Sequence, residues 1–418
     1  MTYYKLGCRW GEDQPSFYEM LIKKSIVIGQ YDEKTPHQLG DIVLIADGHN
    51  ILALAEVVGE RKLCTAMPEL ESEFSKYNIA YDNSTCVADA EIWELPEEKR
   101  FKYEQRIGRC KIDQEEVIQT ASSLMAEFKR SQLEEKCVKL LKSNHNLVLT
   151  GAPGTGKTFA AKKIAELMDD ATWELVQFHP SYDYTDFVEG LRPVMNSRRG
   201  IGFERKDGVF KEFCKRALRD VSKKKPYVFI IDEINRGEIS KIFGELFYSI
   251  DGGYRGEAGR VKTQYQNLVP REDPFYEGFY VPENVYIIGT MNDIDRSVES
   301  IDFAMRRRFA WVEFTAEASQ SMLDSDDAWG EAKKKPKNLG EIKERMDRLN
   351  DCIVSAEIGL TRAYQIGAAY FLKYAPQNGF DALWNNHLKG VLYEYLRGSY
   401  DIDDKMKKLE DAYDNRRL

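Results

Sequence analysis

Residues 151–158 read GAPGTGKT and suit phosphate chemistry. They fit the pattern G-x-x-x-x-G-K-[ST], in which glycines let backbone N–H groups converge on phosphate oxygens. An apolar run at 146–150 (NLVLT) precedes the loop, and apolar residues at helical spacing follow from Lys157 to Leu167. The loop is therefore predicted to join a buried strand to the N-terminus of a helix, which favours anions. The structural alternative is a glycine-rich turn that binds no ligand.

The whole loop is assigned to a nucleoside triphosphate. Its residues are Gly151, Ala152, Pro153, Gly154, Thr155, Gly156, Lys157 and Thr158. We expect the Lys157 ammonium to reach the β- and γ-phosphates and the Thr158 hydroxyl to ligate Mg²⁺.

A second segment, VFIIDE at 228–233, ends an apolar run with two carboxylates. Asp232, at the end of a predicted strand, would hold Mg²⁺ through water, and Glu233 would orient or deprotonate an attacking water. An Asp-Glu pair at a solvated strand end is the alternative, but the phosphate loop upstream favours the catalytic interpretation. The two segments together predict binding of a triphosphate with magnesium and its hydrolysis.

Composition limits the class of protein. The chain has 418 residues, 43% of them hydrophobic and 31% charged, which is typical of a soluble protein with two or three domains. The net charge of −9 gives no global signal for nucleic-acid binding. Seven cysteines without any C-x-x-C pair disfavour a zinc site or a disulfide framework. Because there is neither a bilayer-length apolar run nor an N-terminal signal sequence, we expect a cytoplasmic protein without membrane contact.

The pattern of residues divides the chain into four regions. We predict a β-rich domain at 1–111, a helical linker at 112–145, an α/β nucleotide-binding domain at 146–314 and an α-helical lid at 315–418. The fold class is a parallel sheet flanked by helices, preceded by a small β-rich domain and followed by the lid.

Individual elements are predicted within these regions. The segments expected to be strands are 25–29, 41–46, 51–58, 146–150, 174–178, 227–231, 285–289 and 309–314. Two linker helices are expected at Asp113–Phe128 and Ser131–Leu141, a hairpin at Val194–Phe210, and a polar loop at 251–282. A lysine-rich stretch at 333–337 is interpreted as a solvated loop.

Three blocks carry a family resemblance. They read QFHPSYDYTDFVEGLRP from Gln177, IIDEINRGEISKIFGELFYSID from Ile230 and VYIIGTMNDIDRSVESIDFAMRRRFAWVEF from Val285. In this order and spacing they closely resemble the McrB family, the AAA+ GTPase subunits of modification-dependent (5-methylcytosine-type) restriction systems. The resemblance covers about residues 130–400. A later segment, QIGAAYF at 365–371, lacks the His and Ser of the family's usual I-G-H-S-Y-F.

The resemblance implies roles for further residues. Asn292 matches the sensor asparagine that contacts the γ-phosphate or the attacking water, and Asp295 and Arg296 complete the M-N-x-x-D-R-S block at the nucleotide. Arg306, Arg307 and Arg308 lie where AAA+ proteins place arginines that face a neighbouring subunit's nucleotide. Arg307 and Arg308 are favoured for this catalytic role, and pairing with local carboxylates is the alternative for at least one of the three.

The N-terminal region contains YYKLGCRW at 3–10, IVIG at 26–29, LGDIVLIADG at 39–48 and ILALAEVVG at 51–59. With these segments, about residues 1–110 resemble EVE or YTH-like domains of the PUA superfamily. The resemblance implies a pocket for a modified base flipped out of DNA, with Trp10 and Trp93 as stacking residues and Tyr3 or Tyr4 behind them. Aromatic residues that fill the core of the domain are the alternative.

The resemblance implies a motor that reads modified DNA, assembles as a homo-oligomeric, hexameric ring and hydrolyses GTP with Mg²⁺. The motifs themselves do not distinguish GTP from ATP. The sequence holds no nuclease constellation, so DNA cleavage would require a partner endonuclease of the McrC type. Two alternatives are an AAA+ ATPase that remodels protein substrates and a regulatory switch that binds modified nucleic acid without delivering a nuclease.

Overall fold

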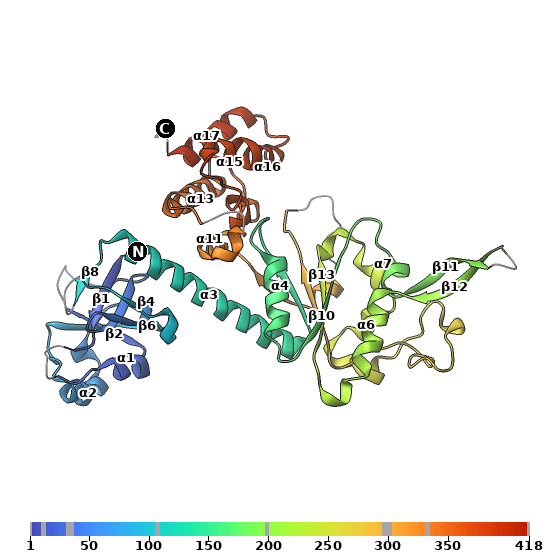
Figure 1. Ribbon diagram of the computed structural model, residues 1–418, viewed down its shortest axis with the longest axis horizontal. Coiled ribbons are helices and arrows are strands. Elements are labelled where there is room, and N and C mark those ends of the chain that lie inside the picture. The colour runs from blue at the N-terminus through green and yellow to red at the C-terminus, as the bar shows by residue number, and fades with distance from the viewer. Residues whose placement is uncertain are drawn as a thin grey trace. The chain divides into compact units, whose positions relative to one another are not determined.

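The computed structural model describes residues 2–9, 14–30, 37–104, 109–196, 200–294, 303–330 and 335–415 (Figure 1). The chain forms two compact units, Met1–Phe128 and Lys129–Leu418. The boundary between them falls within one helix, α3 (Glu115–Asn144). The prediction of two separate linker helices was therefore wrong. No glycine or proline occurs at 128–131, so nothing in the sequence ends the helix there.

The first unit is built on one sheet. Its strands are β1 (Tyr3–Gly7), β2 (Ile26–Gln30), β3 (Ile42–Asp47), β4 (Asn50–Val57), β5 (Lys62–Leu63), β6 (Thr85–Glu94), β7 (Phe101–Lys102) and β8 (Cys110–Lys111). They follow the order β2-β6-β4-β3-β1-β8, with β5 paired to β6 and β7 paired to β4. Only the β1–β3 pair among them is parallel. The three strands predicted in this region correspond to β2, β3 and β4.

Both faces of this sheet are covered, which explains the continuous apolar run in β3. Val43 and Ile45 pack into a core with the helix α1 (Tyr18–Lys24) and the helix α2 (Glu71–Lys76). Ile42 and Leu44 point to the other face, where they pack into a core with the first half of α3. A strand that is buried on both faces is apolar at every position, whereas a strand with one solvent-exposed face alternates apolar and polar residues.

The second unit contains a parallel five-stranded sheet. Its strands are β9 (Asn146–Thr150), β10 (Thr172–Gln177), β13 (Tyr227–Asp232), β14 (Val285–Thr290) and β15 (Ala310–Glu313), in the order β10-β13-β14-β9-β15. All four pairings are parallel, so the carboxyl ends of the strands lie at one edge. All five predicted strands are confirmed, with ends shifted by at most two residues.

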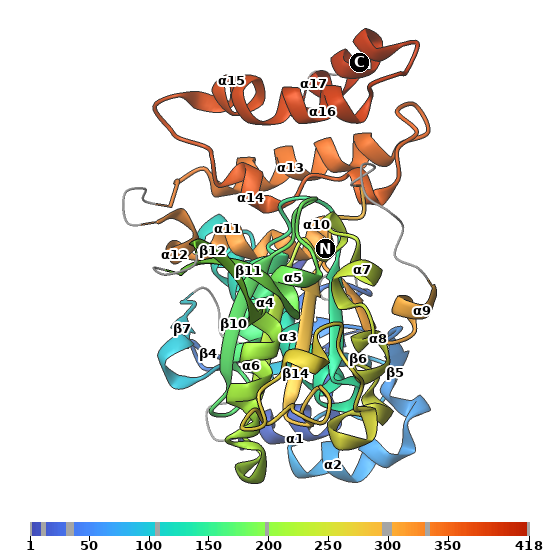
Figure 2. The ribbon, with the colours of Figure 1, turned by 90° about the vertical axis from the view of Figure 1, so that its right-hand side faces the viewer.

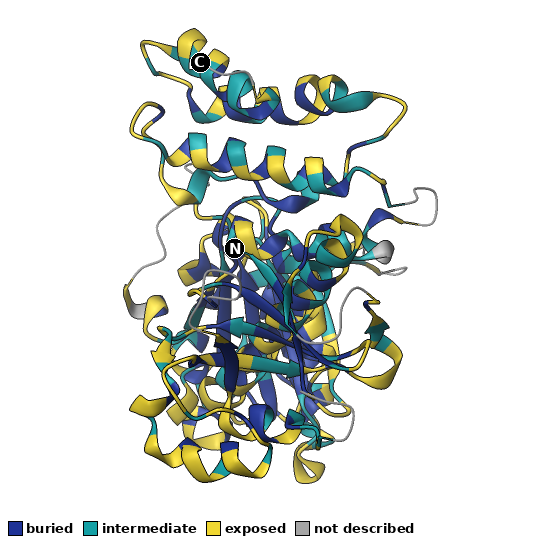
Figure 3. Cartoon of the chain, turned by 90° about the vertical axis from the view of Figure 1, so that its left-hand side faces the viewer, coloured by how far each residue is buried: buried dark blue, intermediate teal, exposed yellow. Residues whose placement is uncertain are grey.

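Helices cover both faces of the parallel sheet (Figures 1 and 2). On one face, α4 (Lys157–Glu166) and the second half of α3 pack on the side chains of β9 and β13. On the other, α6 (Val209–Leu218), α7 (Ile239–Phe243) and α8 (Leu246–Ser249) pack with a large aromatic cluster. Buried residues concentrate on the strands and exposed residues on the outer surfaces of the helices (Figure 3).

Part of the segment at 251–282, which was predicted as a polar loop, is buried in the hydrophobic core. Phe275, Phe279 and Val281 are fully buried in the aromatic core beside β13 and β14. The prediction of a polar loop was therefore only half correct. The segment has turns rather than long elements, but it closes one end of the core.

A β-hairpin projects from the second unit (Figure 1). It consists of β11 (Glu189–Asn196) and β12 (Gly200–Asp207), so it begins five residues before the predicted position. Its base is held by a buried ion-pair cluster in which Lys211 Nζ lies 2.6 Å from Glu189 Oε2, both side chains being fully buried. Arg205 joins the same cluster through Glu189 at 3.0 Å.

Residues beyond Phe314 form helices around a separate core. These are α10 (Ala316–Ser319), α11 (Ser321–Asp324), α12 (Asp326–Trp329), α13 (Leu339–Val354), α14 (Ala368–Phe371), α15 (Gly379–Leu383), α16 (Lys389–Tyr395) and α17 (Ile402–Asp414). The helical character predicted for this region is confirmed (Figure 2). Within the part of the chain that the structure describes, no helix is long and apolar enough to span a membrane.

Candidate nucleotide site

The phosphate loop has the backbone that its glycines allow. Gly151, Gly154 and Gly156 have φ angles of 140°, 79° and 82°, and Gly156 directly precedes the first residue of α4. A side chain at such angles would be strained. The loop thus joins the carboxyl end of β9 to the N-terminus of α4, as the sequence predicts.

Lys157 turns back onto its own loop. Its Nζ donates to the carbonyl oxygens of Gly151 at 3.0 Å and Ala152 at 2.9 Å, and lies 3.3 Å from the Thr155 hydroxyl. Burial of the side chain lowers the pKa of Lys157 to about 8. The ammonium is therefore already held in the concave side of the loop, where a phosphate would compete for its protons.

Two oxygen ligands suited to magnesium meet beside the loop. Thr158 Oγ1 donates to Asp232 Oδ1 at 2.7 Å, which joins the start of α4 to the end of β13. Thr290, at the end of β14, donates to the same carboxylate oxygen at 2.6 Å. A hydroxyl and a carboxylate are the hard ligands that Mg²⁺ takes in triphosphate sites, so this pair fits that ion.

Thr290 was not assigned a role from the sequence. Its hydroxyl also accepts a hydrogen bond from the Glu233 backbone N–H at 3.1 Å, so one side chain fixes both acidic residues. Its position at the end of a strand next to β13 in the sheet was the available signal, but strand order cannot be read from a single motif.

Glu233 and Asn292 form the second pair of the site. Asn292 Nδ2 donates to Glu233 Oε1 at 2.8 Å, and Arg236 Nε lies 3.3 Å from the other carboxylate oxygen. Glu233 has a φ of 52°, a left-handed conformation that is uncommon for a residue with a side chain. Such strain persists only where the surrounding structure imposes it, as it often does at functional sites.

The loop after Asn292 brings another acidic group to the site. Partial desolvation raises the pKa of the Asp293 carboxyl above its ordinary value, and the charge of Lys157 opposes that rise. Asp293, Glu233 and Asp232 all act electrostatically on the Lys157 ammonium. Asp295 and Arg296, which the family resemblance assigns to the nucleotide, lie outside the described residues.

The C-terminal helical region contacts the phosphate loop through its backbone. Gly367 N–H donates to the Pro153 carbonyl at 2.9 Å and Ala369 N–H donates to the Gly154 carbonyl at 3.0 Å. The absence of the usual His and Ser from QIGAAYF does not prevent this contact, because backbone amides make it. A Cβ atom at Gly367 would lie 2.2 Å from the backbone of Gly154, so the approach requires glycine.

The three consecutive arginines have different surroundings. The Arg306 guanidinium lies 5.1 Å from the centroid of the Trp311 ring. Arg308 is turned inward: its guanidinium lies 5.2 Å from the Phe247 ring, its side chain is 10% exposed, and its Nε is 3.9 Å from Asp251. Arg307 is exposed, and within the described residues its guanidinium makes no hydrogen bond or ion pair.

Of the two aromatic residues predicted to stack on a base, Trp10 and Trp93, the structure describes only Trp93. Trp10 lies outside the described residues. The Trp93 ring stacks on Phe128 of α3, with centroids 4.7 Å apart and planes at 9°, and Lys99 Nζ lies 5.9 Å from its centroid. One face of Trp93 is thus covered by the protein itself.

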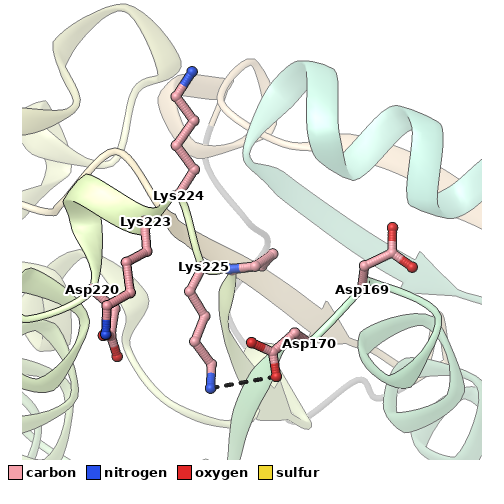
Figure 4. A pocket seen from close by; sticks show the side chains of 7 residues that line it. Asp169, Asp170, Asp220, Lys223, Lys224 and Lys225 are labelled. Carbon is pink, nitrogen blue, oxygen red and sulfur yellow. Dashed lines mark hydrogen bonds and ion pairs between the residues drawn. The ribbon is translucent and has the colours of Figure 1, made fainter.

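A surface pocket of about 370 Å³ lies at the opposite edge of the sheet, before β10 and β13 begin (Figure 4). Aspartates and lysines line it together, and Lys225 Nζ is 3.7 Å from Asp170. Its charges largely compensate one another, and the phosphate loop lies at the other end of the strands, so this pocket is separate from the candidate nucleotide site.

The sheet order, the loop after β9 and the acidic pair after β13 define an AAA+ P-loop NTPase fold. A family model of the AAA domain, dynein-related subfamily, matches residues 146–309.

Two relatives are similar in sequence. The EcoKMcrB subunit of a type IV methyl-directed restriction enzyme from Escherichia coli K12 is 36% identical over 285 residues, which cover 66% of this chain and 58% of that subunit. The YdiS component of the type II restriction enzyme BsuMI from Bacillus subtilis 168 is 26% identical over 234 residues. These cover 50% of this chain and 68% of YdiS. The chain therefore has a McrB-like AAA domain and spans less than two thirds of the first relative.

A solved structure of a putative ATPase from Cytophaga hutchinsonii is 15% identical and covers 71% of this chain and 88% of its own. Its TM-score of 0.28 is too low to support any conclusion about a shared architecture.

Proposed function

We propose that the protein is a nucleoside triphosphatase, a GTPase by its similarity to McrB, that drives a restriction system. The observation that carries the proposal is the arrangement at the carboxyl edge of the sheet. Thr158 and Asp232 meet at 2.7 Å, and Asn292 and Glu233 at 2.8 Å, beside the phosphate loop. One pair suits a magnesium ion and the other a water molecule that attacks the γ-phosphate.

Each residue has a specific task in this proposal. The loop amides and Lys157 bind the phosphates, while Thr158 and, through water, Asp232 hold Mg²⁺. A bound magnesium ion would neutralise charge that develops on the phosphate oxygens. Glu233 accepts a proton from water, and Asn292 orients the Glu233 carboxylate toward it.

The site is completed by a second copy of the chain. AAA+ rings place an arginine of one subunit at the nucleotide of the next, and such a residue stabilises negative charge in the transition state. We assign that role to Arg307, since its side chain is exposed, whereas Arg308 packs on Phe247 and Asp251 of its own subunit. A hexameric ring is the assembly that we expect.

The remaining partners follow from the relatives, both of which are parts of restriction enzymes. We propose that the first unit recognises modified DNA and that a separate McrC-like endonuclease cleaves it. Trp10 is the preferred residue for stacking on a flipped base, because Trp93 already stacks on Phe128. The site of action would be the cytoplasm, where the substrate DNA lies.

The experiment is a turnover assay with GTP and ATP, each with modified and unmodified duplex DNA and with or without the partner endonuclease. We expect turnover of GTP, and cleavage of modified DNA only when endonuclease and GTP are both present. Turnover strictly of ATP that is indifferent to DNA would contradict the proposal and favour a protein-remodelling ATPase.

A further inference from the structure

A buried polar junction lies at the amino end of β9, at the far end of that strand from the phosphate loop. Its centre is Asn146, the first residue of the strand, which has no exposed surface. Asn146 Nδ2 donates to the carbonyl oxygens of Ile250 at 2.7 Å and Arg308 at 2.9 Å. Both protons of the amide are therefore used, and they join the end of α8 to the arginine segment before β15.

Arg255 fixes the orientation of this amide. Its Nη2 donates to Asn146 Oδ1 at 2.5 Å, so the oxygen of Asn146 faces the guanidinium and the nitrogen faces the two carbonyls. Arg255 is only 6% exposed, and burial lowers its pKa to about 10. Its Nε and Nη1 have no hydrogen-bond partner among the residues that the structure describes.

A buried guanidinium with unused donors is unfavourable for folding by itself. An aliphatic residue would fill the same space without that penalty, so packing alone does not explain an arginine here. Its defined effect in the structure is to hold the Asn146 amide in one of its two possible orientations. In the flipped orientation, Nδ2 would face the guanidinium and the carbonyls of Ile250 and Arg308 would lose their donors.

The junction acts on the backbone from which Arg307 projects. Arg308 is fixed at its carbonyl by Asn146 and at its side chain by Phe247 and Asp251. Arg307 is the preceding residue and points into solvent. The two anchors on Arg308 leave little freedom for the peptide that carries Arg307, so the direction of that side chain is set within its own subunit.

We propose that Asn146 and Arg255 are positioning residues for catalysis in a neighbouring subunit. They hold Arg308 so that Arg307 reaches the next subunit's triphosphate in the correct direction. The proposal rests on the trans role of Arg307 in the proposed function. Since a displacement of about 1 Å at a catalytic group can reduce a rate by about 100-fold, the loss of this junction should lower turnover markedly.

The test uses Asn146→Asp, which keeps the shape of the side chain but cannot donate to the two carbonyls. In the full chain we expect turnover to fall about 10- to 100-fold. The affinity for a non-hydrolysable triphosphate should change less than about threefold, because the phosphate loop is intact. Wild-type turnover in Asn146→Asp would overturn the proposal.

Mixed assemblies separate a positioning defect from damage to the variant's own site. Asn146→Asp subunits mixed with Glu233→Gln subunits should recover turnover, because one provides an intact site and the other an intact arginine. Asn146→Asp mixed with Arg307→Ala should recover none, since both lack a working arginine. The reverse pattern would place the defect in the variant's own nucleotide site and overturn the proposal.

Two controls complete the design. Arg307→Ala mixed with Glu233→Gln must recover turnover; if it does not, the trans arginine of the proposed function fails, independently of Asn146. Where Asn146→Asp does not fold, Arg255→Met replaces it, because it removes the donor to Asn146 Oδ1 together with the buried charge. It should give the same mixing pattern with a smaller loss, and equal turnover to wild type would overturn the proposal.

Discussion

At the scale of residues, the site depends on side chains that hold one another in place. The Glu233 carboxylate lies between Asn292 and Arg236, and its backbone N–H is bound to Thr290. These three contacts account for a glutamate that remains in a left-handed conformation. The direction of the Glu233 carboxylate is thus set by β14 and by the turn after β13, not by Glu233 alone.

The neighbouring arginines allow a residue-level prediction. Arg307→Ala should reduce turnover by at least about 1000-fold with unchanged stability, because in the proposed trans role this exposed arginine contributes only to the transition state. Arg308→Ala should lower the free energy of unfolding by about 1 to 2 kcal/mol, since it loses the Phe247 and Asp251 contacts. Steady-state kinetics and urea unfolding measure the two effects. Equal kinetic losses without any difference in stability would contradict this division of roles.

A buried histidine in the first unit gives a pH prediction. His37 is 1% exposed and its Nε2–H donates to the Ile28 carbonyl at 3.2 Å. Burial lowers the pKa of His37 to about 4, and the charges of Arg109 and Arg61 act in the same direction. The hydrogen bond to Ile28 and the charge of Asp41 oppose this lowering.

The unfolded chain has a histidine pKa of about 6.5, so below that pH it binds a proton that the folded state does not. The free energy of unfolding of the first unit should therefore be highest above pH 6.5. It should fall by about 2 kcal/mol between pH 7 and pH 5. Hydrogen exchange of β2 and β6 measures this loss. His37→Gln should remove most of this pH dependence of the unfolding free energy, whereas His387→Gln, at an exposed position, should retain it. Equal pH dependence in the wild type and both variants would refute the role of His37.

At the scale of elements, rigid connections bring distant parts of the second unit to the phosphate loop. The α4 helix begins at the phosphate loop, while β13 and β14 end beside it. Gly367, directly before α14, and Ala369, within α14, bind the loop through backbone hydrogen bonds. The hairpin β11–β12 is held differently, by buried ion pairs at its base.

The contact between Gly367 and the phosphate loop is testable by adding one methyl group. In Gly367→Ala the new Cβ would meet backbone atoms of Gly154 at 2.2 Å and Thr155 at 2.4 Å, which cannot move aside independently of the loop. We expect at least about a tenfold loss of nucleotide affinity, or about 1.4 kcal/mol. Gly390→Ala is the matched control, because open space surrounds that position in α16. Titration with a fluorescent triphosphate analogue measures the affinity of each variant. Equal affinities of Gly367→Ala and Gly390→Ala would show that the contact does not shape the loop.

At the scale of the whole molecule, the proposed activity requires more than one copy of the chain. The phosphate loop, Asp232 and Glu233 are in place within one copy, but the exposed Arg307 has no partner there among the described residues. In the proposed ring each subunit would share its nucleotide with the next, so assembly should depend on the bound nucleotide.

Glu233→Gln gives a prediction about assembly. With GTP and Mg²⁺ it should form a stable ring, because it binds nucleotide without hydrolysing it, and sedimentation velocity should show the larger species. Removal of Mg²⁺ with a chelator should dissociate that species. Lys157→Ala is the control that should remain unassembled, since it lacks the ammonium that binds the phosphates. Normal hydrolysis by Glu233→Gln would exclude Glu233 as the base.

The sequence by itself determined the local elements of the candidate site. Glycine spacing, apolar runs and the Asp-Glu pair depend on neighbours within a few residues, so GAPGTGKT and VFIIDE predict their strands, the helix and their ligands. Only the tertiary structure decided which distant side chains meet. Thr290 joins Asp232, Gly367 meets Gly154, and Asn146 binds Arg308 because of sheet order and close packing, which no local pattern encodes. The same long-range packing turned Arg308 inward and left Arg307 exposed, a distinction that three adjacent arginines in the sequence could not provide.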